Sequence, residues 1–199
     1  VLRHLVETGA IVRVGGRWQV AAGTTAASLP EGVRDVIGRR LNALSSEAND
    51  LATWAAVIGR DFRLDLLTEV GGRSEGEVLD VLDEVLDARL VEETGPDRYR
   101  FSHALVRASL YDELRTSRRV RMHRTVGEAL ERIAPDDLAA LSHHFAEAAP
   151  AGEHDRAVRY TVAAAERASA QLALAEAVEL HRRALDLHDD AGTDGDLAR

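Results

Sequence analysis

Residues Ser74–Phe101 read SEGEVLDVLDEVLDARLVEETGPDRYRF, and this stretch decides the fold of the first half of the chain. Ser74 and Glu77 have the spacing of a capping box, which predicts a helix that begins there and continues to about residue 89. Its apolar stripe recurs at helical spacing: Val78, Leu82, Val85 and Leu86. Two short strands follow, Leu90–Glu93 and Arg98–Phe101, around a turn.

Two further helices are predicted just upstream. One covers about Glu47–Ile58 and is capped by Ser45 or Ser46, and a short one covers Leu64–Val70 and ends at two glycines. The residues between them, Gly59–Phe62, are expected to form a turn. Three helices followed by a two-stranded wing are the winged-helix pattern.

The N-terminal part predicts smaller elements. Strands at Ile11–Val14 and Trp18–Val20 flank two glycines, which is a strong hairpin signal. A short helix is expected before Gly9, and a linker at Gly23–Ser28. A further helix begins near Pro30, with apolar residues at helical spacing. These residues are Val33, Ile37, Leu41 and Leu44.

From His103 onward the pattern is entirely helical. The expected helices cover about 103–115, 117–133, 137–148, 154–170 and 172–188, followed by a polar, flexible tail at 191–199. The last two helices have small residues and spacing similar to tetratricopeptide repeats, which stack as helical hairpins. The residues concerned are Ala165, Ala177, His181, Ala184 and Leu185. The expected fold class is therefore mainly α.

Composition excludes several chemistries. The 199 residues include no cysteine and no lysine, which excludes disulfides, thiol nucleophiles and Schiff-base lysines. There is neither a GxxxxGK(S/T) phosphate loop nor a nucleophile elbow, so the chain is expected to be non-enzymatic. No apolar run is long enough for a membrane span, and we expect a cytoplasmic location and no membrane partner. The chain begins with Val1, from which we expect it to be part of a longer protein.

Charge is unevenly distributed and bears on DNA binding. The third helix of the winged-helix pattern carries six acidic residues, Glu75, Glu77, Asp80, Asp83, Glu84 and Asp87, which would repel phosphates in the major groove. A basic belt follows between two acidic blocks: Arg98, Arg100, Arg107, Arg115, Arg118, Arg119, Arg121 and Arg124. A solvated face that pairs with the acidic blocks is the favoured interpretation of this belt. The alternative is a winged-helix DNA-binding module that uses Arg115–Arg124.

Histidines are the remaining candidates for chemistry. His143 and His144 are adjacent on a helix and point about 100° apart, so they do not form an i, i+4 chelating pair. Together with His154 they are interpreted as structural residues, and no metal site is predicted. His103 lies between a strand and a helix and is flanked by Arg100 and Arg107, an arrangement that suits an anionic group. The alternative is that His103 caps the helix or pairs with a carboxylate.

Five segments together carry a resemblance to a known family. They occur in the expected order and are LPEGVRDVIGRRLNAL at 29–44, LATWAAVIGRDF at 51–62, YRFSHALVR at 99–107, RMHR at 121–124 and EAVELHRRAL at 176–185. In this combination the chain resembles the signal-transduction ATPases with numerous domains, particularly the large LuxR-type bacterial transcription regulators.

The resemblance implies a domain organisation. Residues 1–44 would be the end of the ATPase and lid region, 45–102 a winged-helix module, and 103–190 helical repeats that receive an inducer or partner protein. A P-loop ATPase domain would precede this chain and use ATP and ADP, whereas the chain itself would hold no cofactor. DNA would be contacted by a separate output domain.

The resemblance also gives His103 a role. The run Phe101–Leu105 is similar to the Met-His-Asp motif of that superfamily, whose histidine contacts the β-phosphate of ADP in the closed state. Ser102 replaces the methionine and Ala104 the aspartate, so only the histidine's role carries over. His103 is thus the expected nucleotide-phosphate sensor, with Arg100 and Arg107 as lesser candidates, in the regulatory arm of a nucleotide-controlled switch.

Overall fold

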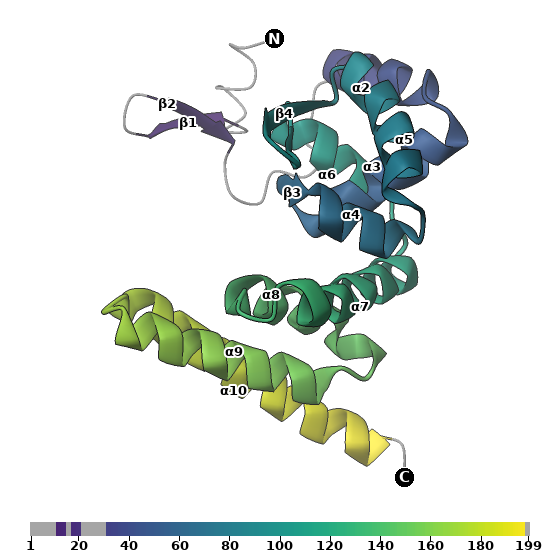
Figure 1. Cartoon of the computed structure of the whole chain (residues 1–199). Coiled ribbons are helices and arrows are strands. Elements are labelled where there is room, and N and C mark those ends of the chain that lie inside the picture. The colour runs from purple at the N-terminus through teal and green to yellow at the C-terminus, as the bar shows by residue number, and fades with distance from the viewer. Residues whose placement is uncertain (1–10, 15–16, 21–30, 198–199) are drawn as a thin grey trace. The chain divides into compact units, whose positions relative to one another are not determined.

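The chain folds mainly into helices, which a three-stranded sheet and a separate hairpin accompany (Figure 1). The structure is a computed structural model that describes residues 11–14, 17–20 and 31–197, with side-chain surroundings for 37–190. The expected helix before Gly9 and the expected linker Gly23–Ser28 lie outside the described residues. The chain divides into two compact units, Val1–Arg115 and Thr116–Arg199.

The N-terminal hairpin is confirmed. Strands β1 (Ile11–Val14) and β2 (Arg17–Val20) pair antiparallel, with Val14 opposite Arg17. This register leaves two residues for the connection, which is the length that alternating strands around two glycines predict.

Helices α2 (Glu31–Asn42) and α3 (Ser46–Ile58) form as expected. Ser45 is the N-cap of α3, since its hydroxyl accepts a hydrogen bond from the Ala48 N–H at 3.1 Å. Ile37 and Leu41 of α2 are buried in the same core as α3, so α2 packs as part of the winged-helix unit.

The expected turn at Gly59–Phe62 is wrong in part. Residues Asp61–Arg63 form strand β3, which pairs antiparallel with β5 (Arg98–Phe101), and Phe62 lies opposite Tyr99. The pairing is stabilised because it buries the side chain of Phe62 on the inner face of the sheet. There the Phe62 ring stacks on Tyr99, with ring centroids 5.8 Å apart.

The rest of the winged-helix pattern is confirmed. Helix α4 (Leu64–Gly71) ends at Gly72, which adopts the left-handed conformation with φ of 62°. Helix α5 (Glu75–Asp87) begins with the predicted capping box, and β4 (Val91–Gly95) pairs antiparallel with β5. The sheet order is β3-β5-β4, so the wing has three strands rather than two.

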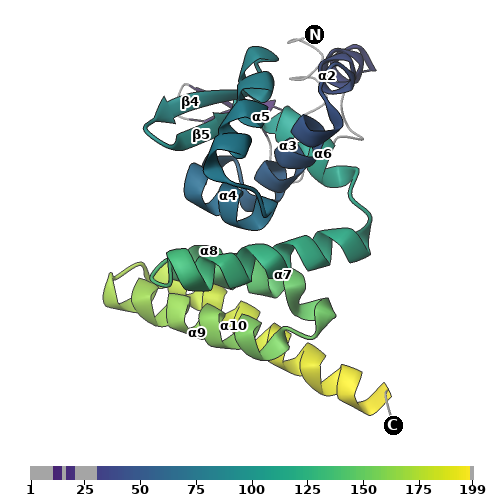
Figure 2. The same cartoon turned by 45° about the vertical axis from the view of Figure 1, so that its right-hand side comes forward.

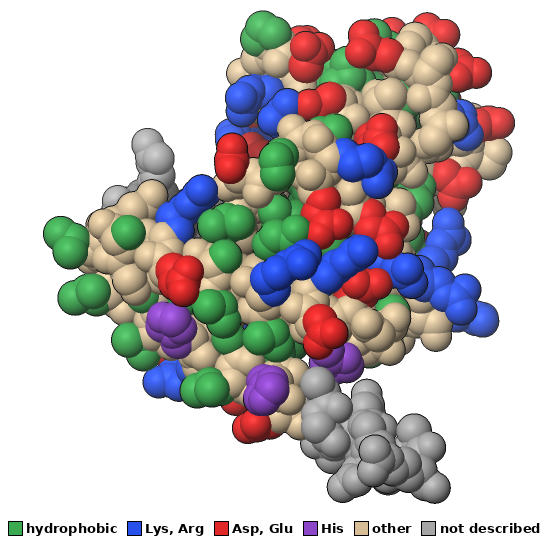
Figure 3. All heavy atoms as spheres, turned by 60° about the horizontal axis from the view of Figure 1, so that its bottom comes forward, with side chains coloured by type: hydrophobic (Ala, Val, Ile, Leu, Met, Phe, Trp, Pro, Cys, Tyr) green, Lys and Arg blue, Asp and Glu red, His purple; other side chains and the backbone are tan. Residues whose placement is uncertain are grey.

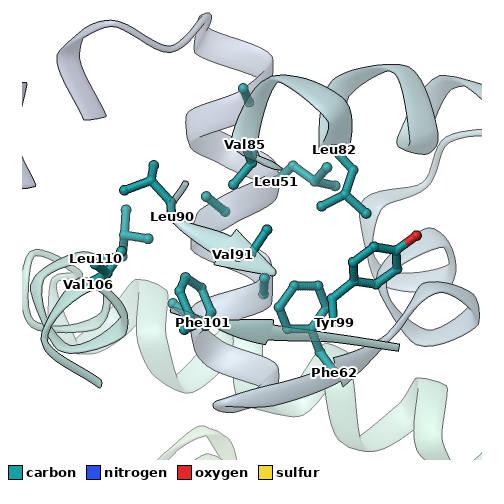
Figure 4. Packing of buried hydrophobic residues seen from close by; sticks show 14 of the residues in the cluster. Leu51, Phe62, Leu82, Val85, Leu90, Val91, Tyr99, Phe101, Val106 and Leu110 are labelled. Atoms are coloured by element: carbon teal, nitrogen blue, oxygen red, sulfur yellow. The ribbon is translucent and has the colours of Figure 1, made fainter. Parts of the chain in front are cut away.

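One hydrophobic core unites this unit (Figure 4). Val78, Leu82 and Val85 of α5 are buried as predicted, whereas Leu86 is only partly buried against the core. Phe101 is fully buried, and complete burial of a side chain of this size stabilises a fold by about 1.5–3 kcal/mol. Helix α6 (Ala104–Asp112) adds Val106 and Leu110 to the same core.

The second unit is a stack of helices packed in sequence order (Figure 2). It contains α7 (Thr116–Ile133), α8 (Leu138–Ala148), the short 3₁₀ helix η2 (Ala149–Ala151), α9 (His154–Ala170) and α10 (Leu174–Leu197). Ala165 of α9 and Ala177 and Ala184 of α10 are buried, as the repeat-like spacing predicts. Small side chains at these positions let the two helices approach closely.

Helix α10 differs from the sequence prediction. It continues to Leu197, so the backbone of the expected tail 191–199 is helical as far as the structure describes it. No proline interrupts this segment, and single glycines weaken a helix without ending it. His181 and Leu185, expected in the repeat pattern, are exposed, with Leu185 at 65%.

The division between the units lies one helix later than the expected boundary at 102/103. Helix α6 packs on α3 and α2, and the first unit ends at Arg115, after this helix. The expected boundary at 44/45 also falls inside this first unit, because α2 and α3 share a core. Among the helices that the structure describes, none combines the length and apolar character needed to cross a membrane.

Candidate functional site

His103 lies at the junction between β5 and α6. It occupies the N-cap position of α6 with an extended backbone (φ −139°, ψ 138°), and its side chain is exposed. His103 is thus the N-cap residue, as the alternative interpretation expected, but its imidazole makes no hydrogen bond to the first turn of α6. The N–H groups of a first helical turn lack intrahelical partners and carry partial positive charge, which favours an anion at this point.

Ser102 fixes the backbone just before His103. Its hydroxyl contacts the carbonyl oxygens of Arg89 at 2.9 Å and Leu90 at 3.0 Å, and its N–H donates to the Leu90 carbonyl at 3.0 Å. The junction is thereby tied to the turn that follows α5. Sequence reasoning missed this role, because the partners lie more than ten residues away.

Arg100 already has a carboxylate partner. It lies on β5 directly opposite Asp61 of β3, and its Nε donates to Oδ1 of that residue. Both side chains are about half exposed, so the ion pair is of the surface kind, which contributes little to stability. An anion near Arg100 would therefore compete with Asp61.

Arg107 has a structural role. Its Nε donates to the carbonyl oxygen of Ala56 on α3 at 2.9 Å, and its guanidinium lies 5.3 Å from the ring centroid of Tyr111. Burial lowers the pKa of Arg107 below its ordinary value. The residue thus joins α6 to α3. The roles of His103, Arg100 and Arg107 toward a nucleotide stay predictions.

The outer face of α5 is acidic. Five of its carboxylates are exposed, namely Glu75, Glu77, Asp80, Asp83 and Asp87. The sixth, Glu84, accepts hydrogen bonds from the N–H and the hydroxyl of Ser45, the latter at 2.8 Å. This distribution disfavours insertion of α5 into a DNA groove, since nonspecific affinity depends on neutralising phosphates.

The basic belt is divided between the two units. Arg98, Arg100, Arg107 and Arg115 belong to the first, and Arg118, Arg119, Arg121 and Arg124 belong to the second. Arg124 is paired with carboxylates within its own unit: its Nε lies 3.0 Å from both Glu128 and Glu153. The hydrogen bond that Arg124 donates to Glu128 and the charge of Glu153 raise the pKa of Arg124.

The second unit brings three histidines together. Two of them, His123 and His144, are buried, whereas the histidine side chains at the surface in Figure 3 lie apart from one another. His123 of α7 lies beside His143 and His144 of α8, and their nearest ring nitrogens all fall within 4.8 Å of one another. His154, the other histidine considered from the sequence, begins α9 and is not part of this cluster. Sequence reasoning missed His123, although it stands in the apolar stripe of α7 beside Met122 and three residues before Val126.

A cavity of about 210 Å³, lined by both polar and apolar side chains, adjoins the cluster. It lies between α8, α9 and α10, and its lining includes His143, Ser142 and the charged side chains of Asp137, Arg167 and Glu176. Ser142 and Thr161 are buried nearby and share a hydrogen bond of 2.9 Å between their hydroxyls. Two buried polar residues of α8, Ser142 and His144, thus have polar partners on the neighbouring helices α9 and α7.

The chain matches no known protein family, and no curated protein is detectably similar to it. By its fold it is a mainly helical protein with a small antiparallel sheet and a helical stack.

Proposed function

We propose that this chain is a non-catalytic regulatory segment of a nucleotide-switched multidomain protein. The first unit would dock on an ATPase domain elsewhere in the same protein, and the helical stack would receive an inducer or partner protein. The carrying observation is the exposed imidazole of His103 at a helix N-terminus that its side chain does not cap.

His103 is suited to contact a phosphate. An imidazole N–H and the N–H groups of the first turn of α6 both donate hydrogen bonds, and the helix dipole favours negative charge there. Ser102 holds the preceding backbone through its bonds to the Arg89 and Leu90 carbonyls. A nucleotide phosphate bound to another domain could therefore accept hydrogen bonds from the His103 imidazole and from the first N–H groups of α6, whose positions are already fixed.

A switch also needs a readout of the bound state. Arg107 joins α6 to α3, so a phosphate held at the start of α6 would act on the whole first unit. An inducer on the helical stack would favour release only if its affinity differs between the docked and released states. The segment would thus couple nucleotide state to partner binding without chemistry of its own.

The test uses a protein in which this chain follows its ATPase domain. His103→Ala should accelerate ADP release by about 10- to 100-fold, the effect of losing one hydrogen bond to a charged group. Stopped-flow displacement of a fluorescent ADP analogue measures this rate. His181→Ala, an exposed histidine of α10, is the matched control and should leave the rate unchanged. Equal ADP release from His103→Ala and the unaltered protein would refute the proposal.

The alternative of DNA binding through Arg115–Arg124 has a separate test. A gel-shift titration of the chain with duplex DNA at low salt should show no retardation if the regulatory proposal holds. Retardation that weakens steeply as salt rises would favour the DNA-binding alternative, because phosphate contacts release counterions.

A further inference from the structure

The histidine cluster of the second unit has the composition of a metal site. His123 from α7 and His143 and His144 from α8 place three imidazoles around one point, with ring centroids 5.0 to 5.5 Å apart. Imidazole is the commonest protein ligand for divalent transition metals. The cluster belongs to one unit, so its geometry does not depend on how the two units are arranged.

Helix packing creates this convergence. His123 and His144 lie on the buried faces of two neighbouring helices and are 0% and 2% exposed. His143 is partly exposed, and its ring meets the other two edge-on, at 80° to His123 and 68° to His144. Although adjacent positions on a helix point about 100° apart, the ligand nitrogens of His143, His144 and His123 lie within 4.8 Å of one another. The partly exposed His143 also gives an ion a path to the two buried rings.

The metal-free cluster already holds two nitrogens close together. Nδ1 of His123 and Nδ1 of His144 are 2.9 Å apart, so one of them donates a proton and the other accepts it. In the form in which both rings are neutral, the two rings are opposite tautomers. An ion bound to both nitrogens would replace this hydrogen bond as the link between α7 and α8.

We propose that His123, His143 and His144 bind a divalent transition-metal ion of the zinc type. Zinc–nitrogen bonds of 2.0–2.1 Å at tetrahedral angles need nitrogens about 3.3 Å apart. The Nδ1 atoms of His123 and His144, now 2.9 Å apart, would move apart by a few tenths of an ångström. The partly exposed side chain of His143 would turn toward the ion. Three nitrogen ligands leave the fourth position open to water.

The protons balance without a further reactant. With the ion on Nδ1 of both His123 and His144, each ring carries its single proton on Nε2. The ring that donates from Nδ1 in the metal-free state shifts that proton to Nε2, and none is released. The pocket that His143 lines carries two carboxylates, Asp137 and Glu176, and two guanidiniums, Arg167 and Arg183, so its charged side chains balance one another. Water in that cavity can reach the open position.

The first experiment is a zinc titration of the chain after treatment with a chelator. Isothermal calorimetry should give one ion per chain with a dissociation constant of micromolar or below. Cobalt(II) is the second probe, because it absorbs strongly in the visible when four-coordinate and weakly when octahedral. Intense visible bands at one equivalent are expected. Absence of zinc binding, or cobalt spectra of the octahedral kind, would overturn the proposal.

His143→Ala tests the ligand set with little disturbance of the core, since this side chain is partly exposed and the other two histidines are buried. It should weaken zinc binding at least about 10-fold. Even the loss of a residue that only hydrogen-bonds to a metal ligand lowers metal affinity by about this factor, and His143 is proposed as a ligand itself. His181→Ala on α10 is the matched control and should retain full affinity. Circular dichroism checks that both variants stay folded. Undiminished affinity in His143→Ala would assign the bound zinc to other residues and refute the site.

Discussion

The ring of Phe145 on α8 packs directly on the backbone of Gly127 on α7. A Cβ atom at Gly127 would lie 2.9 Å from Cζ of that ring and 3.0 Å from Cε1, closer than side chains approach. Phe145 is fully buried and stacks on Tyr160, with ring centroids 5.3 Å apart, so it has little room to retreat. Only glycine lets these two helices meet at this distance.

Gly127→Ala should therefore destabilise the second unit. Overpacking a core costs about 1–3 kcal/mol, and the better helix propensity of alanine returns up to about 1 kcal/mol. We expect a net loss of about 1–2 kcal/mol in the free energy of unfolding, measured by urea denaturation. Gly38→Ala, where nothing lies within 4 Å of the added carbon, is the control and should stabilise α2 slightly. A neutral Gly127→Ala would show that α7 and α8 can separate freely.

Glu84 on α5 holds the start of α3 through Ser45. Its carboxylate accepts from both the N–H and the hydroxyl of that N-cap residue. Glu84→Ala should lower the free energy of unfolding by about 1–3 kcal/mol, because part-buried donors lose a charged acceptor. Asp83→Ala is the control, since Asp83 is exposed on the same turn and should change stability by less than about 0.5 kcal/mol. Equal losses in the two variants would contradict the assigned role.

Local signals in the sequence predicted most of the fold. The capping box at Ser74, the glycine end of α4 and the helical stripe of α5 all act within a few residues, so their patterns are readable. Strand β3 was missed because its stability comes from pairing with β5, and Asp61 lies 39 residues from its partner Arg100. Three residues are too few to show an alternating pattern of their own.

The same distinction holds at the candidate sites. The exposed junction at His103 could be predicted, because a strand, a turn and a helix follow one another there. The approach of His123 to His144 could not, since helix packing joins residues 21 positions apart. Likewise, the hydrogen bond from Arg107 to the Ala56 carbonyl spans 51 positions, so the sequence could not show that Arg107 joins α6 to α3.

Glu77 provides a test of the capping box by pH. Hydrogen bonds from the hydroxyl and then the N–H of Ser74 lower the pKa of Glu77 below its ordinary value of 4.5. A lowered pKa in the folded state means that the carboxylate stabilises α5 above pH 4.5 and loses this effect as the pH falls through the folded-state pKa. Carbon-13 NMR titration of the Glu77 carboxyl should show this depressed pKa directly.

Variants at Ser74 identify the cause. Ser74→Ala removes the hydroxyl and should return the pKa of Glu77 toward its ordinary value, with a loss of about 0.5–2 kcal/mol in the free energy of unfolding. Ser74→Thr keeps a hydroxyl and should preserve most of the depression. If the pKa of Glu77 did not move in Ser74→Ala, another group would have to be responsible.

The buried hydroxyls of Ser142 and Thr161 should behave as one unit. They share a hydrogen bond of 2.9 Å between α8 and α9, and both side chains are almost wholly buried. Thr161→Val keeps the shape but leaves Ser142 without this partner, at a cost of about 1–3 kcal/mol in the free energy of unfolding. Replacing both, as Ser142→Ala with Thr161→Val, removes the unmatched group and should cost clearly less than the two single losses added together. Denaturant unfolding of the four proteins measures the coupling. Strictly additive losses would mean that each hydroxyl is satisfied within its own helix, and that the bond between α8 and α9 contributes nothing to holding the stack together.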